Sequence, residues 1–149
     1  MEYTLYKPNK KQTGTAIKFN VHKSGKFSFM KAAEQIAEMG SPKVFGWDDP
    51  KAINVKMGLN DLGAFLSVFV GSQETVKLFH RTETDNKSIE LTHAPARGGY
   101  GLKVSHQIQS TREVDNLFIG VTYAEAAIIK VYVESAIRDI LEANVWSGE

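Results

Sequence analysis

The sequence predicts an α+β domain made of two similar halves, in each of which about four antiparallel strands are followed by one helix. Three observations lead to this prediction. Short stretches of alternating apolar and polar residues recur along the chain, which is the period of half-buried strands. Two stretches, one central and one near the C-terminal end, instead space their apolar residues as a helix does. A glycine stands shortly before each of these helical stretches, Gly58 and Gly120, so the order strands, glycine, helix occurs twice.

The central stretch, residues 43–70, shows this order most clearly. A strand ends at Phe45-Gly46-Trp47, Asp48-Asp49-Pro50 forms a turn, and residues 52–57 alternate as the next strand. The helical spacing begins at Leu62. We expect Asn60 to cap this helix and Gly71 to end it in a left-handed conformation.

The other elements follow from the same patterns. Residues 15–21 and 27–29 read as a hairpin, and residues 30–39 read as a strand with a bulge or a short helical turn. Residues 76–81, 89–93, 102–108 and 117–121 alternate as an antiparallel meander, with turns expected at 85–87 and 94–99. Thr122 and Glu125 form a T-x-x-E capping box that starts the last helix, which runs to about Ala143.

The length of 149 residues predicts one domain. We assign residues 1–13 to a mobile or partner-dependent N-terminal arm and residues 14–146 to the domain, with halves 14–71 and 72–146. The chain has no cysteine, which excludes disulfides and thiolate metal sites. It also has no apolar run of the ~20 residues that a membrane span needs, and no apolar signal segment at its start. We therefore expect a soluble cytoplasmic protein with no membrane partner, nucleoid-associated or in the host cytoplasm if phage-encoded.

The net charge of +1 gives no global argument for an anionic partner, so the position of the charges matters more. On the alternation above, Lys18, Lys56, Lys77 and Lys103 lie on the side of their strands that faces away from the core. A binder of single strands needs cations for phosphates and flat rings for exposed bases. The predicted nucleic-acid-binding residues are therefore these four lysines with Arg81, Arg97, Trp47, Phe79, Phe45 and Tyr100.

Each of these residues also has a structural interpretation. Lysines on a half-exposed sheet serve solubility and discourage pairing at edges. Trp47 either stacks on a base or closes one end of the core. We expect at least one of Phe27 and Phe29 to pack in the core. The glycine segment before Tyr100 could be a flexible loop that closes over a bound strand, but the pattern favours an ordinary hairpin turn.

Several segments together resemble the Whirly proteins, the single-stranded-DNA-binding proteins of plant organelles, and their wider superfamily, which includes guide-RNA-binding proteins. Phe45-Gly46-Trp47-Asp48 is similar to the Whirly Y-D-W region, and residues 59–66 are similar to its T-E-I-G-T-L helix start. Leu78-Phe79-His80 resembles the F-F-H strand, and residues 121–126 resemble I-T-K-A-E-F-A. The resemblance covers residues 13–146.

The resemblance implies two blade-like antiparallel sheets backed by two helices, assembly into homo-oligomers, tetramers in the family, and single strands bound over the sheets. One segment departs from the family. Gly14-Thr15-Ala16-Ile17 resembles the K-G-K-A-A-L motif, but Thr13 and Thr15 replace its two lysines. Those lysines are tied to DNA binding and higher assembly in the family.

The sequence offers little for catalysis. The four histidines, His22, His80, His93 and His106, lack close metal-ligand spacing, and the last three fall on apolar strand faces. Gly98-Gly99-Tyr100-Gly101 lacks the strand-to-helix setting of a phosphate loop. We therefore expect no enzyme, no metal and no cofactor.

The function that these observations favour is single-stranded DNA binding, largely independent of sequence, that protects or presents strands in replication, repair or recombination. Two alternatives stay open: a single-stranded RNA-binding protein, and a structural or protein-interaction module that has lost nucleic-acid binding.

Overall fold

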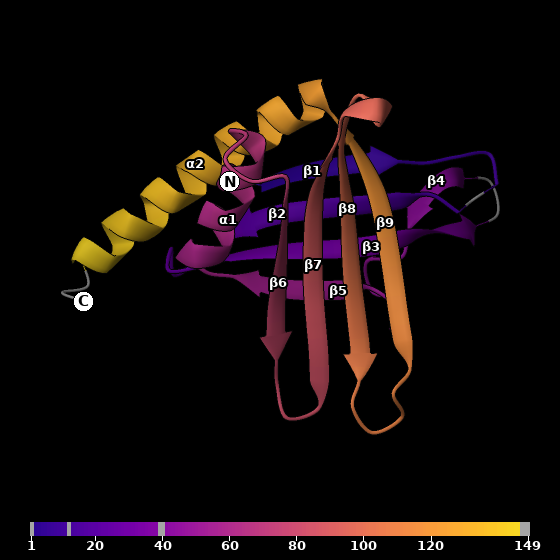
Figure 1. The fold of residues 1–149 in the computed structure, drawn as a ribbon. Helices are drawn as coiled ribbons and strands as arrows, with labels where there is room; N and C mark the ends of the chain where they lie inside the picture. The colour runs from indigo at the N-terminus through magenta and orange to yellow at the C-terminus, as the bar shows by residue number, and fades with distance from the viewer. Residues whose placement is uncertain (1, 12, 39–40, 147–149) are drawn as a thin grey trace.

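The computed structural model describes residues 2–11, 13–38 and 41–146, in which two antiparallel sheets and two long helices follow one another along the chain (Figure 1). The first sheet contains β1 (Glu2–Lys7), β2 (Thr15–Val21), β3 (Ser28–Glu38), β4 (Ser41–Phe45) and β5 (Ile53–Met57), and α1 (Leu59–Phe69) follows it. The second contains β6 (Thr75–Arg81), β7 (Asp85–Ala94), β8 (Gly99–Ile108) and β9 (Val114–Thr122), and α2 (Tyr123–Trp146) follows it. This is the predicted repeated order of strands and helix.

The long strand β3 is the centre of the first sheet. β2 pairs along one side of it, while β5 and β4 pair with successive stretches of its other side. The register shifts between Ile36 and Glu38, so the ambiguous stretch 30–39 is a strand with a bulge over its described part. Ala32 and Ala33 are fully buried on opposite faces. Contacts on both faces therefore override the helix propensity of this alanine-rich stretch.

The second sheet is the predicted meander, with strand order β6-β7-β8-β9. The predicted turn at 85–87 is wrong, because β7 already begins at Asp85. The chain reverses at 82–84 instead, where the Thr82 hydroxyl accepts a hydrogen bond from the backbone N–H of Asp85 at 3.0 Å. A threonine side chain thus closes the turn just before the stretch where the sequence pattern placed it.

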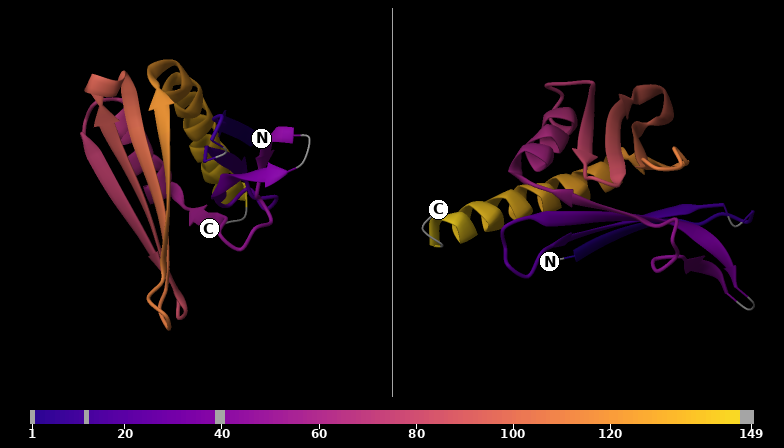
Figure 2. Two further views of the ribbon diagram at one scale, coloured as in Figure 1. Left: turned by 90° about the vertical axis from the view of Figure 1, so that its right-hand side faces the viewer. Right: turned by 90° about the horizontal axis from the view of Figure 1, so that it is seen from below.

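The two sheets share one hydrophobic core with the helices. The strands of one sheet run across those of the other (Figure 1), and α2 contacts strands of both (Figure 2). Among the largest fully buried side chains, Phe19 and Met30 come from the first sheet, Ile89 from the second, Phe65 from α1 and Ile140 from α2. Each sheet therefore has an inner face, turned to this core, and an outer face on its opposite side.

The start of α1 differs from the prediction. Gly58, not Asn60, is the N-cap residue, and its backbone N–H donates to the Asp61 carboxylate at 3.0 Å. A carboxylate in the first turn also favours the positive end of the helix dipole. The predicted helix stop is confirmed, because Gly71 has a φ of +83° directly after the C-cap residue Val70.

Six residues of the predicted N-terminal arm, Glu2–Lys7, form an edge strand. β1 pairs with β2 over its whole length, and Leu5 is buried in the main core. The mobile arm over residues 1–13 is therefore wrong for Glu2–Lys7. Tyr3 and Leu5 alternate toward the core, a signal too short to stand out before the polar segment that follows Lys7.

The capping box at the start of α2 is confirmed and is tied to β1. The backbone N–H of Thr122 donates to the Glu125 carboxylate at 2.9 Å, and the backbone N–H of Glu125 donates to the Thr122 hydroxyl at 3.2 Å. Lys7 Nζ lies 2.6 Å from the same carboxylate. Burial alone would raise the pKa of Glu125, but the hydrogen bonds from Lys7 and Thr122 outweigh it and lower the pKa.

We predict that Glu125→Ala lowers the free energy of unfolding by about 1–2 kcal/mol at pH 7, from the lost cap and ion pair. Because the folded-state pKa is lowered, this stabilisation is present above the ordinary pKa of glutamate and is lost as the pH falls through the lowered value. Urea unfolding at pH 7 and pH 3 checks this, with the difference from wild type shrinking at pH 3. Glu142→Ala, at an exposed position of α2, is the control and should change stability by less than about 0.5 kcal/mol. An equal effect of Glu125→Ala at both pH values contradicts the prediction.

Candidate functional site

Cations and rings gather on the outer faces of both sheets. Strand alternation turns Lys18 of β2 and Lys56 of β5 away from the core, and it does the same for Lys77 of β6 and Lys103 of β8. The structure thus places all four predicted lysines on outer faces. Each of them also lies over an aromatic ring, with Nζ-to-centroid distances of 4.4 Å for Lys18–Trp47, 4.2 Å for Lys56–Phe27, 5.1 Å for Lys77–Phe79 and 5.5 Å for Lys103–Phe118.

The second sheet presents its rings most openly. Phe79 is 71% exposed and Phe118 is 63% exposed, so neither ring contributes to the core. Core packing therefore does not explain why large apolar rings stand at these two positions. Phe118 was not predicted, because it lies inside the apolar run Leu117–Val121. Because Leu117, Ile119 and Val121 of that run alternate toward the core, the residue between the first two, Phe118, is the one expected to face outward.

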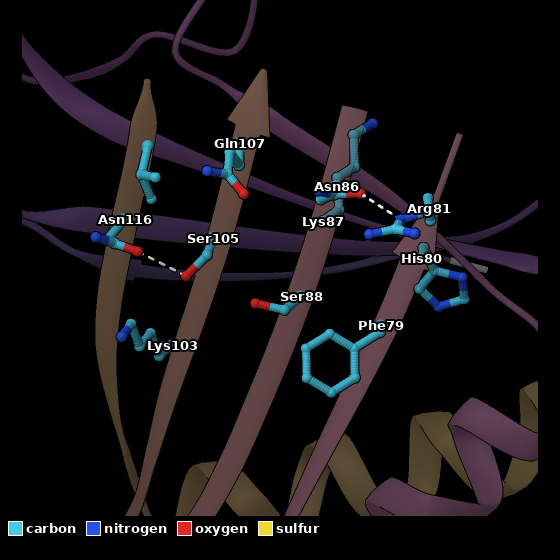
Figure 3. A pocket seen from close by; sticks show the side chains of 11 residues that line it. Phe79, His80, Arg81, Asn86, Lys87, Ser88, Lys103, Ser105, Gln107 and Asn116 are labelled. Carbon is cyan, nitrogen blue, oxygen red and sulfur yellow. Dashed lines mark hydrogen bonds between the residues drawn. The ribbon is translucent and has the colours of Figure 1, made fainter. Parts of the chain in front are cut away.

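A groove of about 570 Å³ lies on this outer face (Figure 3). It is lined by residues from all four strands: Phe79, His80, Arg81, Asn86, Lys87, Ser88, Lys103, Ser105, Gln107, Val114 and Asn116. All of these stand at outward positions except the paired residues His80 and Lys87, which are at inward positions of β6 and β7. Its volume is within the range of about 300–1,000 Å³ that small-ligand sites occupy. No acidic side chain is among these lining residues.

The charge on this outer face is mostly positive. Lys77, Arg81 and Lys103 face outward, and the register places Glu90 of β7 between the two lysines. Within the described bounds of β6 to β9, Glu90 is the one acidic side chain at an outward position. The face therefore attracts anions while retaining one local source of repulsion.

The rings of the first sheet are less open. Phe45 is only 7% exposed and packs with Ala16 and Ala33 in a small cluster on the outer face. It therefore presents no free ring face to a base, contrary to its predicted role. Trp47 packs beside this cluster, half-buried, with Lys18 over its ring. Trp47 does not close an end of the main core.

A second ring cluster lies where β2 turns into β3. His22 stacks on Phe27 with centroids 4.4 Å apart, and Phe29 meets Phe27 edge-on at 5.3 Å. The expectation that Phe27 or Phe29 packs in the main core is wrong, because both are only half-buried and lie outside it. The register explains this, since Phe29 faces outward beside its β5 partner Lys56.

Tyr100 and Arg97 lie away from the groove. Tyr100 is at an inner position of β8, where its ring meets Phe69 edge-on at 5.1 Å, so it is not part of the outer face. Ahead of Tyr100, a 3-10 turn (η1, Pro95–Arg97) ends at the left-handed Gly98, and β8 begins at Gly99. Arg97 is exposed there and lines a second groove, of about 340 Å³, near Phe118.

The segment that replaces the Whirly lysines borders this second groove. Thr13 and Thr15 line it together with Arg97 and Lys7. Gly14 lies so close to Lys7 that a Cβ atom there would come within 2.1 Å of the Lys7 carbonyl oxygen. The segment therefore approaches the backbone of β1 closely, and Lys7 and Arg97 are the positive side chains among the residues that line this groove.

Three histidines lie beside polar groups on the inner side of the second sheet. His106 Nε2 lies 2.8 Å from Asp85 Oδ1, and this hydrogen bond is the main cause of the lowered pKa of Asp85. His93 Nε2 lies 2.8 Å from the Tyr123 hydroxyl. His80 Nε2 lies 3.0 Å from Asp61 Oδ2 but without the alignment of a hydrogen bond. Within the described ranges, no three His, Asp or Glu side chains group closely enough to hold a metal ion.

Across the described residues, neither helix is long and apolar enough to span a bilayer.

The fold is similar to solved structures from plants and trypanosomes. No protein-family model and no curated protein sequence matches the chain. The structure of WHY1 from Arabidopsis thaliana matches with a TM-score of 0.73 at 15% identity, over 99% of this chain and 89% of that one. The plant transcriptional regulator PBF-2 matches with a TM-score of 0.72 at 16% identity, over 99% and 86%. A guide-RNA-binding protein complex bound to a guide RNA matches with a TM-score of 0.66 at 15% identity, over 92% and 89%.

At these identities the matches show the fold. WHY1, PBF-2 and the similar WHY3 are Whirly proteins, so the predicted Whirly-like fold is confirmed. Two antiparallel sheets, each followed by a helix, are its architecture. The similarity extends over nearly the whole chain, including β1, which the sequence patterns had left outside the domain.

Proposed function

We propose that this protein binds single-stranded DNA, largely independently of sequence, on the outer faces of its two sheets. The observation that carries the proposal is the repeated pairing of a lysine with an aromatic ring, twice on each sheet. A single strand exposes two features that duplex DNA does not expose together, flexible phosphates and free base faces. A lysine beside a ring supplies a partner for each.

In the free protein the lysine is held over the ring by cation–π attraction, worth about 0.5–1 kcal/mol at an exposed site. When a strand binds, the ammonium group moves to a phosphate oxygen and the ring face is released for a base. Stacking contributes about 1–3 kcal/mol per base, and every base has a π-face, so the binding needs no particular sequence. Phe79 and Phe118 are the rings most open to this exchange.

We propose that the biological role is to protect or present single strands during replication, repair or recombination. Nothing in the proposed mechanism makes or breaks a covalent bond, so we propose a binding protein and not an enzyme. RNA is the alternative ligand. It is favoured by the similarity to the guide-RNA-binding complex, whose solved structure contains its RNA.

Fluorescence anisotropy with single-stranded DNA, single-stranded RNA and duplex DNA of one length, each titrated with salt, tests the proposed function. Five phosphate contacts per protomer, from the four lysines and Arg81, predict a slope of log K against log salt of about −3.5 for single strands. We expect DNA to bind more tightly than RNA and both more tightly than duplex. Tighter binding of RNA supports the alternative ligand, whereas preferential binding of duplex, or a slope near zero, refutes the mechanism.

We further propose that the protein forms a homo-oligomer, a tetramer by resemblance, through the outer side of α2. Ile128 and Val131 are 52% and 63% exposed on this helix, opposite the residues that it buries in the core. Ala124 and Ala127 lie on the same side and are exposed too. Small and branched side chains in one stripe suit close packing against a second helix.

Val131→Lys should shift the protein to a smaller oligomer, because a lysine there is costly to bury between helices. Light scattering coupled to size-exclusion chromatography measures the mass of wild type and variant. Ser110→Lys, in the exposed β8–β9 turn, adds the same charge and should leave the mass unchanged. A monomeric wild type, or a Val131→Lys variant of unchanged mass, contradicts the proposal.

Glu90→Gln should tighten the binding of single-stranded DNA by about threefold at low salt. The change removes a negative charge between Lys77 and Lys103, and such surface charge terms are about 0.2–1 kcal/mol. The gain should shrink as salt is added, because exposed charges are screened. Glu83→Gln, in the exposed β6–β7 turn, is the matched control, and an equal gain there would show that only net charge matters.

A further inference from the structure

We propose that the groove of the second sheet prefers bases with carbonyl edges, thymine and uracil, over adenine. This inference rests on the proposed function and adds a base preference to it. It comes from two asparagines that line the groove, Asn86 of β7 and Asn116 of β9, and from the way their neighbours orient them.

Both asparagine side chains have their oxygen occupied by a donor from the protein (Figure 3). The Ser105 hydroxyl donates to Asn116 Oδ1 at 2.6 Å. Arg81 Nε donates to Asn86 Oδ1 at 3.1 Å, and Gln109 Nε2 donates to the same oxygen at 3.2 Å. Both lone pairs of the Asn86 oxygen and one of the two on Asn116 are therefore engaged, so these amides offer mainly their NH₂ groups, which only donate.

The two NH₂ groups have no acceptor among the described residues, so they remain available to a ligand. The charged side chains that line the groove, Arg81, Lys87 and Lys103, are donors as well. No acidic residue is among the lining residues, so the remaining acceptors are neutral groups such as Gln107 and Ser88, and every charged group is a donor.

Each asparagine lies within reach of an exposed ring. Phe79 pairs with Ser88, which places Asn86 at the diagonal position, about 7–8 Å away across the strands. Asn116 and Phe118 are two residues apart on one face of β9, a spacing of about 7 Å. A base stacked on either ring therefore extends its edge toward an amide NH₂ group.

The edges of the bases then decide the preference. Thymine and uracil present two carbonyl oxygens, either of which accepts from an NH₂ group, whereas each edge of adenine combines a ring-nitrogen acceptor with the exocyclic NH₂ donor. Where that NH₂ donor meets the donors of the groove, both are left without a partner once water is excluded. We infer a preference of about tenfold for thymine or uracil over adenine at these two positions.

The test compares anisotropy titrations of oligo(dT), oligo(dA) and an abasic oligonucleotide of the same length. Wild type should bind oligo(dT) about tenfold more tightly than oligo(dA). Because oligo(dA) also loses its own stacking on binding, the decisive readout is how variants change this ratio. Asn86→Ala combined with Asn116→Ala should reduce the ratio to about threefold or less while the affinity for the abasic strand is kept.

Ser105→Ala is a second, milder variant, because it frees the Asn116 oxygen without removing the amide, and it should also lower the ratio. Asn54→Ala, an exposed asparagine on the first sheet, is the matched control and should leave the ratio unchanged. An unchanged ratio in the double variant, or a wild type that binds oligo(dA) as tightly as oligo(dT), overturns the inference and leaves the proposed function standing. If no oligonucleotide binds wild type, the proposed function fails and the inference with it.

Discussion

Replacing Lys77, Arg81 and Lys103 together by glutamine should weaken the binding of single-stranded DNA by on the order of 100-fold at low salt. Each side chain lies on the outer face of the second sheet, and a phosphate contact there is worth about 1 kcal/mol, the upper end for exposed ion pairs. Three fewer contacts should also make the slope of log K against log salt less steep by about 2. Salt-titrated anisotropy measures both quantities.

The matched control removes three exposed lysines that lie off the outer faces. Lys10→Gln, Lys11→Gln and Lys23→Gln together change the net charge by the same amount. This variant should lose only a few-fold in affinity, from the weaker long-range field of the protein. If the two triple variants weaken binding equally, the second sheet is not the binding surface.

Removing both open rings, by Phe79→Ala with Phe118→Ala, should also weaken binding by on the order of 100-fold, but with the salt slope unchanged. Two lost stacking contacts at about 1.5 kcal/mol each give this magnitude. Because the rings are 71% and 63% exposed, the unfolding midpoint should stay close to that of wild type. The opposite pattern, a changed slope with little loss of affinity, would mean that these rings do not stack on bases.

Val114→Ala is the control for the double ring variant. Val114 is 51% exposed and borders the same groove, but it has no ring. Its removal deletes apolar area without deleting a stacking surface. Binding of single-stranded DNA should therefore change less than about threefold.

Together the two triple variants and the ring variants separate charge from stacking. The cation variant changes both the affinity and the salt slope, whereas the ring variant changes the affinity alone. This separation follows from the pairing of each lysine with its own ring, since the two partners can be removed one at a time.

The strand periodicity made the outer lysines predictable. In a pleated strand every second side chain faces the same way, so the buried Ile53, Val55 and Met57 of β5 alone place Lys56 on the opposite face. The same alternation places Lys77 and Phe79 on the outer face. Phe118 is harder to predict, because it stands between the apolar residues Leu117 and Ile119.

Other features depend on tertiary structure. Phe45 has the right composition for a stacking residue, but its neighbours Ala16 and Ala33 are small enough to let it sink into the sheet surface. Tyr100 followed a glycine segment that read as a loop, yet the strand begins at Gly99 and turns the ring inward. For Phe45 no local pattern contains this information, because it depends on which strands become neighbours, whereas for Tyr100 the alternation of Leu102 and Val104 would have placed the ring inward had the strand been started at Gly99.

The lysine–ring pairs could not be predicted from the sequence patterns either. Lys18 and Trp47 are far apart along the chain and meet because β2 and β4 flank β3. Lys103 and Phe118 face each other because β8 and β9 pair in one particular register. Periodicity gives the face of a strand, whereas register gives the neighbour on that face.

Ultraviolet crosslinking of single-stranded oligo(dT) to the protein, followed by mass spectrometry of the peptides, tests the central claim most directly. The outer faces of both sheets should carry the nucleotide, with crosslinks concentrated at Phe79 and Phe118 and a weaker site at Trp47. Crosslinks confined to α2 or to the inner-face residue Tyr100, with none on an outer face, would contradict the account.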